Sequence, residues 1–412
     1  MKKLFTKKIF IIAVSILLVV TLIFGAVAIY KKVTTLKSNI ISSDQPIAIT
    51  LPRPSDALSG IYWGLNFARN PWDMQAFDGK VFISSGDYGE NSGPAKIIAY
   101  NPKDGSFSNI DSLYSEQITR FYVSRDTLYT FAIDPISWGN GEFYAKKKGS
   151  GDSRFEYFDV FPSFVHCLDM IEYDDKLFFC GQVMDRTYSL VQYINLSDMP
   201  VVDESTTHHP RMYKDGVEVT GEHILISMCE LFEFEGNLYA HHISSERIGD
   251  PYAGLYVYNK ELDRFDYVEG EKTLKPVLDK HDGNVDYDLI QAEVTYDNKL
   301  VFANNGLFYT SDLKNYTECS FGEDYKGFIA HDLLEIDGQL YVLASKQLKN
   351  GKHKTCVFVT EDLEQFAEVL NFESNSYMIS FEYIDKTFIF GEGGTAKDTA
   401  ESCGNLYAVK VE

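Results

Sequence analysis

The fold is decided by one short stretch, Ile336-Asp337-Gly338-Gln339-Leu340-Tyr341, which returns in degenerate form along the chain. It combines an apolar residue, a two-residue turn, a polar residue and a Leu-Tyr pair. The seven copies begin at Phe77, Ser124, Tyr173, Phe234, Tyr296, Ile336 and Ile384. Asp-Gly and its relatives accept the positive φ of a type I′ turn, so each copy predicts a β-hairpin.

The spacing of these hairpins predicts a repeat fold. Counted at the second turn residue, the copies are 47, 49, 61, 62, 40 and 48 residues apart, lengths that suit one four-stranded blade each. Further strands are expected after the first hairpin at residues 96–100 and from residue 106. A length of 412 residues would ordinarily suggest two or three domains, but a closed repeat accommodates such a chain in one body.

From residue 72 onward the chain resembles the β-propellers, especially the kelch-like and galactose-oxidase-like kind, in which a similar turn precedes Leu-Tyr-Val-type residues. The double glycine of that pattern survives only as Gly393-Gly394, and residues 310–316 and 360–366 resemble shortened Asp-boxes of sialidase-type propellers. The resemblance implies an all-β, seven-bladed β-propeller. The sequence has no match to the residues of the galactose oxidase copper site or to the arginine cluster of sialidases.

The last repeat ends at residues 406–411, which read as a third strand with no fourth to follow. A propeller leaves no open edge when another segment completes that blade. We therefore expect residues 46–51 or 61–65 to supply the missing strand.

The N-terminal segment predicts a membrane anchor. Residues 9–30 carry no charged side chain and are flanked by lysines; as a helix they would span about 33 Å, enough for a hydrocarbon core of about 30 Å. We expect a cytoplasmic N-terminus (1–8), a transmembrane signal anchor (9–30), a stalk (31–45) and an extracytoplasmic propeller (46–412). The alternative is a signal peptide cleaved after Ala28, which would release the propeller.

Charge and cysteine content narrow the class of partner. The net charge is −22, and it becomes −29 without residues 1–43, so nucleic acid is excluded while cations or basic partners suit the surface. The six cysteines include no C-x-x-C pair, which excludes a zinc knuckle or a thioredoxin-type motif. Cys167 and Cys180 flank one hairpin and are either disulfide-bonded or buried free thiols.

Candidate functional residues occupy equivalent positions at the start of each first strand, six residues before the turn. These ring positions hold Asp73, Arg120, Asp169, Glu230, Ala292, Asp332 and Ser380, with His166 and His331 near the same end of their strands. Four carboxylates around one axis repel unless they are hydrated, metal-bound or partly protonated. They either bind a ligand or Ca²⁺, or they cap neighbouring backbone and hold channel water. No EF-hand spacing occurs, so no resident metal or other cofactor is expected.

Three loops are further candidates for ligand contact. Residues 85–94 include Asp87, Tyr88 and Glu90 and suit a sugar or Ca²⁺, although a plain surface loop explains them too. Residues 198–222 contain His208 and His209, which point to opposite faces of an extended chain and are not expected to share a metal. Residues 269–286 are rich in charged side chains, which predicts a surface loop.

No hydrolase signature is present: the chain lacks G-x-S-x-G, H-E-x-x-H, a Walker loop and a G-x-G-x-x-G after a strand. The sequence therefore favours a membrane-anchored, extracytoplasmic binding or scaffold module for a protein or glycan over an enzyme. The alternative is a carbohydrate-active enzyme, a glycoside hydrolase or lyase, that uses the carboxylates Asp73, Asp169, Glu230 and Asp332 at the channel mouth.

Overall fold

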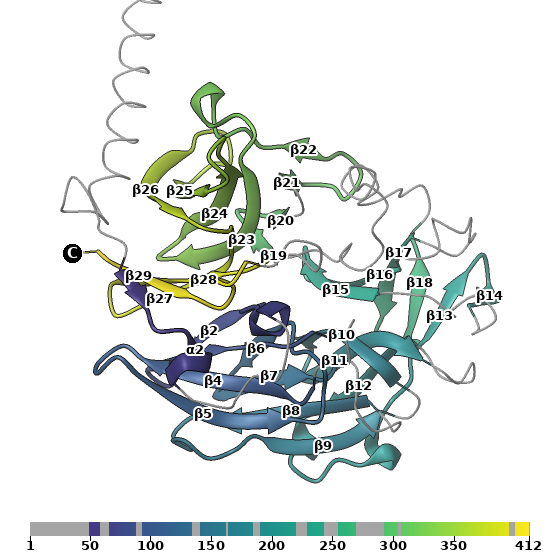
Figure 1. Ribbon diagram of the computed structural model, residues 1–412. Helices are drawn as coiled ribbons and strands as arrows, with labels where there is room; N and C mark the ends of the chain where they lie inside the picture. The colour runs from purple at the N-terminus through teal and green to yellow at the C-terminus, as the bar shows by residue number, and fades with distance from the viewer. Residues whose placement is uncertain are drawn as a thin grey trace, which may run out of the picture.

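The structure is a computed structural model that describes residues 49–57, 66–87, 93–133, 141–161, 164–183, 190–219, 229–242, 254–268, 292–303, 306–394 and 400–411. In these ranges the chain forms seven β-sheets arranged around a central axis (Figure 1). Each sheet is one blade, and we number the blades 1–7 in chain order from residue 74. The seven-bladed, all-β fold predicted from the sequence is confirmed.

Four blades are plain four-stranded antiparallel meanders. Blade 1 comprises β2 (Met74–Phe77), β3 (Lys80–Ile83), β4 (Ala95–Asn101) and β5 (Ser106–Leu113). Blade 2 comprises β6 (Phe121–Ser124), β7 (Thr127–Phe131), β8 (Gly141–Lys147) and β9 (Glu156–Phe161). Blade 5 comprises β19 (Ala292–Tyr296), β20 (Lys299–Ala303), β21 (Leu307–Thr310) and β22 (Thr317–Glu318). Blade 6 comprises β23 (Ile329–Ile336), β24 (Gln339–Gln347), β25 (His353–Thr360) and β26 (Ala367–Ser374).

Blade 7 closes the ring with a strand from the other end of the chain. It comprises β27 (Met378–Ile384), β28 (Thr387–Glu392), β29 (Leu406–Lys410) and β1 (Ile49–Leu51). β1 pairs antiparallel with β29, and Figure 1 shows it at the outer edge of this sheet. The missing strand therefore comes from residues 46–51, as expected, and the alternative segment 61–65 lies outside the described residues.

Blades 3 and 4 depart from the plain pattern. Blade 3 comprises β10 (Phe164–Tyr173), β11 (Lys176–Val183) and β12 (Val191–Asn195). Blade 4 comprises β15 (Cys229–Phe234), β16 (Asn237–His242), β17 (Gly254–Asn259) and β18 (Arg264–Tyr267), extended by β13 (Arg211–Lys214) and β14 (Val217–Glu218). β13 pairs parallel with β18, so the segment after blade 3 adds two strands to the outer edge of blade 4. We call this segment, residues 196–218, the strap.

The repeated hexapeptide forms the hairpin between the first two strands of each blade. In six of the seven copies both turn residues have positive φ, as in Asp78 (50°) with Gly79 (75°), which is the geometry of a type I′ turn. In the second copy only Arg125 has a positive φ, in keeping with its looser sequence. The pattern therefore predicted both the place and the type of turn.

The recurring apolar pair of the hexapeptide fills the space between blades. Its first member is at most 1% exposed in every copy: Val81, Leu128, Leu177, Leu238, Leu300, Leu340 and Phe388. Aromatic rings bridge neighbouring blades, as in Phe82 with Phe155 and Tyr341 with Phe388. Burial of these side chains is the main force that joins the blades.

Helical segments in the described ranges are short. They are α2 (Pro54–Ala57) and 3₁₀ turns at Asn66–Arg69, Leu196–Asp198, Glu204–Thr206 and Glu323–Tyr325. None of the described helices has the length and apolar character needed to span a membrane. The predicted anchor, residues 9–30, lies outside the described residues.

Candidate functional site

The first strands of the blades lie nearest the central axis, and we call the region where they meet the channel. β2 contacts β6 and β27, β10 contacts β6 and β15, and β23 contacts β19 and β27. Four of the ring positions predicted from the sequence lie at or next to the start of their strands, in β2, β6, β15 and β19. The other three, Asp169, Asp332 and Ser380, lie inside β10, β23 and β27, because these strands begin earlier than the sequence predicted. Charged groups from different blades meet at this level.

Asp73 shows how a ring carboxylate is used. Its Oδ1 accepts the N–H of Met74 at 2.8 Å, and its Oδ2 accepts the N–H of Phe121, in blade 2, at 2.6 Å. One carboxylate thus satisfies two backbone donors on adjacent blades. We call this arrangement the Asp clamp.

The Asp clamp recurs at two more blade interfaces. Asp169 accepts from its own neighbour Met170 at 2.9 Å and from Leu231 of blade 4 at 2.8 Å. Asp332 accepts from Leu333 at 2.8 Å and from Phe381 of blade 7 at 2.9 Å. Both oxygens of each clamp carboxylate are therefore engaged by backbone N–H groups, which supports the prediction that ring residues cap neighbouring backbone.

Arg120 links three blades at the same level. Its Nη1 donates to Asp169 Oδ1 of blade 3 at 2.8 Å and to Glu293 Oε1 of blade 5 at 3.2 Å. Asp169 is 2% exposed, whereas the Arg120 and Glu293 side chains keep 23% and 16% exposure. Burial lowers the pKa of Arg120, but the surrounding carboxylates outweigh it and the net shift is upward.

Among the described residues the channel holds more carboxylates than cations, and burial raises the pKa of several of these carboxyl groups. Burial raises the pKa of Asp73 to about 6, against the lowering by its clamp hydrogen bonds and Arg120. Burial likewise raises the pKa of Glu293 to about 8, helped by the charges of Asp169 and Glu230 and opposed by Arg120. Glu230 is 2% exposed and lies 3.8 Å from His241 Nδ1. Carboxylates in a low-dielectric channel with surplus negative charge therefore bind protons at a higher pH than carboxylates in water do.

The junction of blades 7 and 1 uses other groups. Ser380 Oγ donates to the carbonyl of Pro71, and Glu382 Oε2 accepts the N–H of Ala76 at 2.6 Å. Burial raises the pKa of Glu382 to about 7. The Asn70 side chain pairs with Gly394 through both of its polar atoms, at 2.8 and 3.1 Å. The glycine pair singled out in the sequence therefore lies at the closure of the ring.

The two candidate histidines are held by neighbours on their own blades. His166 Nδ1 lies 2.8 Å from Gln182 Oε1, and His331 Nε2 lies 2.7 Å from Ser345 Oγ. Burial, with the charge of His353, lowers the pKa of His331 to about 3, so its ring is neutral at physiological pH. His331 also stacks on Tyr377, with ring centroids 5.1 Å apart.

The structure describes different parts of the three candidate loops. Asp87 is buried and its N–H donates to the Glu116 carbonyl, whereas Tyr88 and Glu90 lie outside the described residues. The loop at residues 198–222 is not a plain ligand loop, because the described part forms the strap, in which His208 stacks on Tyr193. Residues 269–286 lie outside the described residues.

Cys167 and Cys180 are both buried free thiols. In the strand pairing Cys167 is opposite Gly181 and Cys180 is opposite Asp169, so the two cysteines do not face each other. Of the two states left open by the sequence, the structure shows the free thiols.

Sequence reasoning missed Glu293 and Glu382, although both belong to the channel cluster. Glu293 follows Ala292, the apolar ring position of blade 5, and Glu382 lies two residues after Ser380. The available signal was a carboxylate within two residues of a ring position that lacks one. A comparison of one aligned position across the seven repeats could not detect these two residues.

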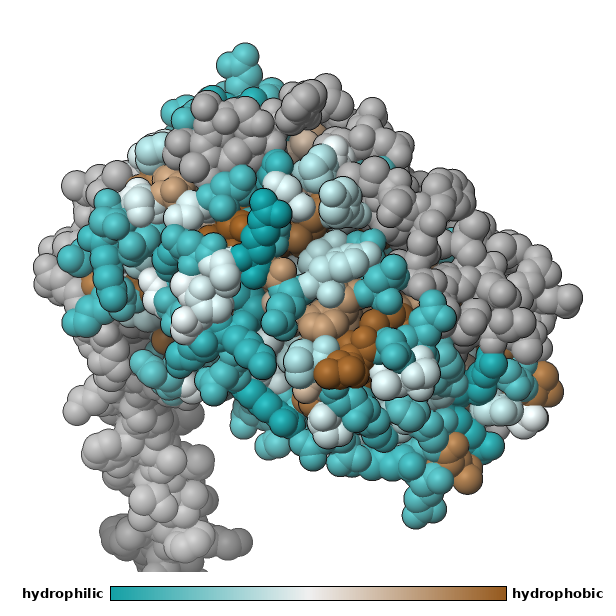
Figure 2. All heavy atoms as spheres, turned by 90° about the horizontal axis from the view of Figure 1, so that it is seen from below, coloured by the Kyte–Doolittle hydropathy of each residue, from teal (hydrophilic) through white to brown (hydrophobic). Residues whose placement is uncertain are grey.

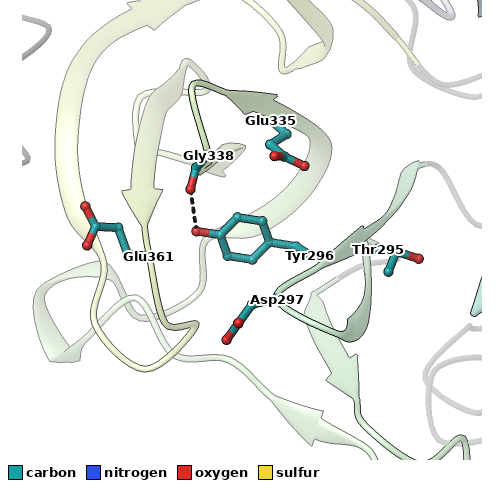
Figure 3. Close-up of a pocket in the computed structure, with 6 residues that line it drawn as sticks. All are labelled: Thr295, Tyr296, Asp297, Glu335, Gly338 and Glu361. Atoms are coloured by element: carbon teal, nitrogen blue, oxygen red, sulfur yellow. Dashed lines mark hydrogen bonds between the residues drawn. The ribbon is translucent and has the colours of Figure 1, made fainter. Parts of the chain in front are cut away.

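A pocket of about 470 Å³ lies at the turn end of blades 5 and 6, remote from the ring positions. It is lined by Thr295, Tyr296, Asp297, Glu335, Gly338 and Glu361. Figure 3 shows the Tyr296 ring in the middle, with its hydroxyl bonded to the Gly338 carbonyl at 3.1 Å. The three carboxylates lie on different sides of this ring and do not point at one common centre (Figure 3). Within the described residues no group of three or more His, Cys, Asp or Glu side chains is placed to hold a metal ion.

Comparison with known proteins gives a fold likeness alone. No protein-family model and no curated protein sequence matches the chain. The crystal structure of the computationally designed Ika8 protein is 8% identical, with 83% of this chain and 96% of that chain covered and a TM-score of 0.46. A chain of the mitotic checkpoint complex is 8% identical, with 90% and 96% covered and a TM-score of 0.47. At these values neither structure carries an argument about the channel or the pocket, and the fold rests on the seven sheets themselves.

Proposed function

We propose that this chain is a membrane-anchored, extracytoplasmic β-propeller that binds a protein or glycan partner at the cell surface and catalyses no reaction. The observation that carries the proposal is the use of the ring carboxylates. Asp73, Asp169 and Asp332 each give both oxygens to backbone N–H groups, so these carboxylates hold blades together. Glycoside cleavage needs two carboxylates that face a substrate, one to donate a proton and one to attack or activate water.

The surface also favours recognition through polar groups. Figure 2 shows a face on which hydrophilic residues predominate and apolar surface is confined to small areas. The large apolar side chains that are exposed in the described ranges come from different parts of the chain, among them Tyr114, Val201 and Leu262. Scattered apolar residues are normal for a protein surface and do not form an apolar docking face. The anchor at residues 9–30 would hold such a module at the membrane.

Kinship with kelch-like and Asp-box propellers is part of the proposal. Its support is local: the repeated hairpin, the glycine pair at residues 393–394, and a shared turn. In that turn Thr310 Oγ1 accepts the N–H of Leu313, as Thr360 Oγ1 accepts that of Leu363, both at 2.9 Å. Asp312 and Asp362 each cap two further N–H groups.

The test is a hydrolysis screen of the full chain, purified in detergent, against a glycan panel, beside Asp169→Asn and Asp332→Asn variants. We expect no hydrolysis by any of the three proteins. Hydrolysis by the unmodified chain that is lost in both variants, while their thermal midpoints remain measurable, would establish the enzyme alternative. The location is tested by protease treatment of intact cells, which should cleave the propeller only if it lies outside.

A further inference from the structure

Two of the large side chains that are exposed in the described ranges are aromatic, and both belong to the outer edges of blades 1 and 2. Tyr114 directly follows β5, the fourth strand of blade 1, and is 67% exposed. Tyr157 lies in β9, the fourth strand of blade 2, and is 50% exposed. The other Phe, Tyr and Trp side chains of the described residues are buried or half-buried. These two rings therefore offer aromatic area that the fold itself does not use.

The outer strands of blades 1 and 2 approach each other where these tyrosines lie. Asp111 Oδ2, in β5, accepts the N–H of Phe155, the residue before β9, at 3.0 Å. The Phe155 ring packs edge-on against Phe82 of blade 1, with 6.3 Å between the ring centroids. Figure 1 shows β5 and β9 along the same outer edge of the molecule. Tyr114 and Tyr157 thus come from the two sides of one boundary between blades.

A buried carboxylate, Glu142, connects the two exposed tyrosines. The Tyr157 hydroxyl donates to Glu142 Oε1 at 3.0 Å, and the Tyr144 hydroxyl donates to Glu142 Oε2 at 2.6 Å. The N–H of Tyr114 donates in turn to the Tyr144 hydroxyl. Glu142 and Tyr144 are each 3% exposed, so they form the floor beneath the two exposed residues. We call these four residues the tyrosine site.

The polar groups of the tyrosine site are mainly acceptors. Asp159 is exposed, lies opposite Glu142 in the strand pairing, and is within hydrogen-bond reach of the Tyr157 hydroxyl. Burial raises the pKa of Glu142, against the lowering by the hydroxyls of Tyr144 and Tyr157. Carboxylate oxygens accept hydrogen bonds from sugar hydroxyls, whereas their charge repels sugars that carry carboxylate or sulfate groups.

This chemistry suits a sugar better than a protein. No other large apolar side chain of β5, β8 or β9 is exposed, so the apolar area is limited to two separate rings. A protein interface usually has a contiguous, closely packed centre that is more apolar than its rim. A pyranose ring instead has a small face of C–H groups that packs on a single aromatic ring, while its hydroxyl groups form hydrogen bonds at the edge.

We propose that the tyrosine site binds a neutral oligosaccharide, with one pyranose ring packed on Tyr157 and another on Tyr114. The inference rests on the proposed binding function and deepens it, because it names a ligand class and a place. Hydroxyl groups of the sugar donate to Asp159. The bond from the Tyr157 hydroxyl to Glu142 holds that ring in place before the sugar arrives, which reduces the entropy lost on binding.

The test is calorimetry of the full chain, purified in a detergent without a sugar head group, with cellohexaose, maltohexaose, chitohexaose and mannohexaose. We expect at least one of these neutral hexasaccharides to bind with a dissociation constant below about 1 mM. Hexagalacturonate, which is anionic, should bind at least tenfold more weakly than the best of them, and equal or tighter binding would overturn the neutral class. Binding of none of the neutral probes would overturn the glycan site, and the wider binding function would then rest on a protein partner.

Tyr114→Ala and Tyr157→Ala are the decisive variants, because each removes one exposed ring. We expect each to weaken binding of the best hexasaccharide at least fivefold, and Tyr157→Phe, which keeps the ring, to weaken it less than threefold. Val201→Ala and Leu262→Ala shorten exposed apolar side chains elsewhere and should change binding less than twofold. Equal losses in Tyr157→Phe and Tyr157→Ala would overturn packing on this ring. Full binding by both tyrosine-to-alanine variants would overturn the tyrosine site while supporting the proposed function.

Discussion

The interface of blades 3 and 4 and that of blades 5 and 6 share one hydrogen bond and differ at both ends. In each, a tyrosine hydroxyl donates to a glycine carbonyl of the next blade, Tyr173 to Gly236 and Tyr296 to Gly338. At the ring end, the first has the Asp169 clamp, whereas the second has the apolar Ala292 in the equivalent position. At the turn end, the first holds Lys260 over Tyr173, whereas the second has a pocket lined by Glu361 beside Tyr296. The first interface therefore has a cation over its tyrosine, whereas the second has a pocket beside the equivalent ring.

The strap strengthens this contrast. It leaves blade 3 after β12 and places β13 parallel to β18, so one segment joins the outer edges of blades 3 and 4. Blade 5 instead reaches across the channel, where Glu293 meets Arg120.

Removing the Asp169 clamp should have the largest effect. Asp169→Ala leaves the N–H of Leu231 without its acceptor and Arg120 with one carboxylate partner fewer, so we expect a loss of about 3–5 kcal/mol of unfolding free energy. Urea denaturation of the full chain measures it. The control is Asp152→Ala, at a side chain that is 58% exposed, where a loss below about 0.5 kcal/mol is expected. Similar losses in both variants would show that the clamp contributes little.

Replacing Glu293 should change how stability depends on pH. A carboxyl group whose folded-state pKa lies above its unfolded value stabilises the fold below the unfolded pKa, and this contribution disappears as the pH rises through the folded pKa. For Glu293, with a pKa of about 8 in the fold against 4.5, the window runs from about pH 4.5 to about pH 8. We expect about 2–3 kcal/mol to be lost across it, less than the full shift implies because 16% of the side chain meets water.

Thermal unfolding of the unmodified chain and of Glu293→Gln between pH 5 and pH 8.5 checks this expectation. The variant should lose less stability over that range and keep the part of the slope due to Asp73 and Glu382, whose pKa values burial also raises. Glu373→Gln, a change at a side chain that is 51% exposed, should follow the unmodified chain. Identical slopes in Glu293→Gln and the unmodified chain would contradict the role assigned to Glu293.

Replacing the two equivalent tyrosines, Tyr173 and Tyr296, should lower the unfolding free energy by a smaller amount, similar at the two interfaces. Tyr173→Phe removes the interblade hydrogen bond to Gly236, and Tyr296→Phe removes the one that its hydroxyl shares between the carbonyls of Gly338 and Thr360. Both variants keep the ring, so we expect each to lose about 0.5–1.5 kcal/mol in urea denaturation. Tyr114→Phe, at a side chain that is 67% exposed, is the control and should be neutral. A loss at one interface alone would show that the two hydrogen bonds are not equivalent.

Local sequence pattern predicted much of this molecule because the repeat is local. Type I′ turns, their buried Leu or Val and the aspartate ring positions all follow from one hexapeptide and a fixed offset. Three blades have a register shift just before the ring position, between Cys167 and Asp169, Ala330 and Asp332, and Met378 and Ser380. No feature of the sequence predicts these shifts.

The remaining features depend on contacts between distant segments. The contact of Arg120 with Glu293 joins residues 173 positions apart, and it reaches a blade whose own ring residue, Ala292, is apolar. β13 and β18 pair in parallel and are not joined by a turn, so no local sequence pattern predicts their pairing. The pocket beside Tyr296 likewise forms between two blades, from residues that no local sequence pattern brings together.

Lys260 provides the finest test of the contrast between the two interfaces. Lys260→Met keeps most of the aliphatic stem but removes the charge over Tyr173, and we expect a loss of about 0.5–1 kcal/mol, the usual range for an exposed cation over an aromatic ring. Urea denaturation measures the loss, with Lys103→Met at an exposed turn as the control. If Lys260→Met unfolds no more easily than the control, the ammonium is not held by the Tyr173 ring.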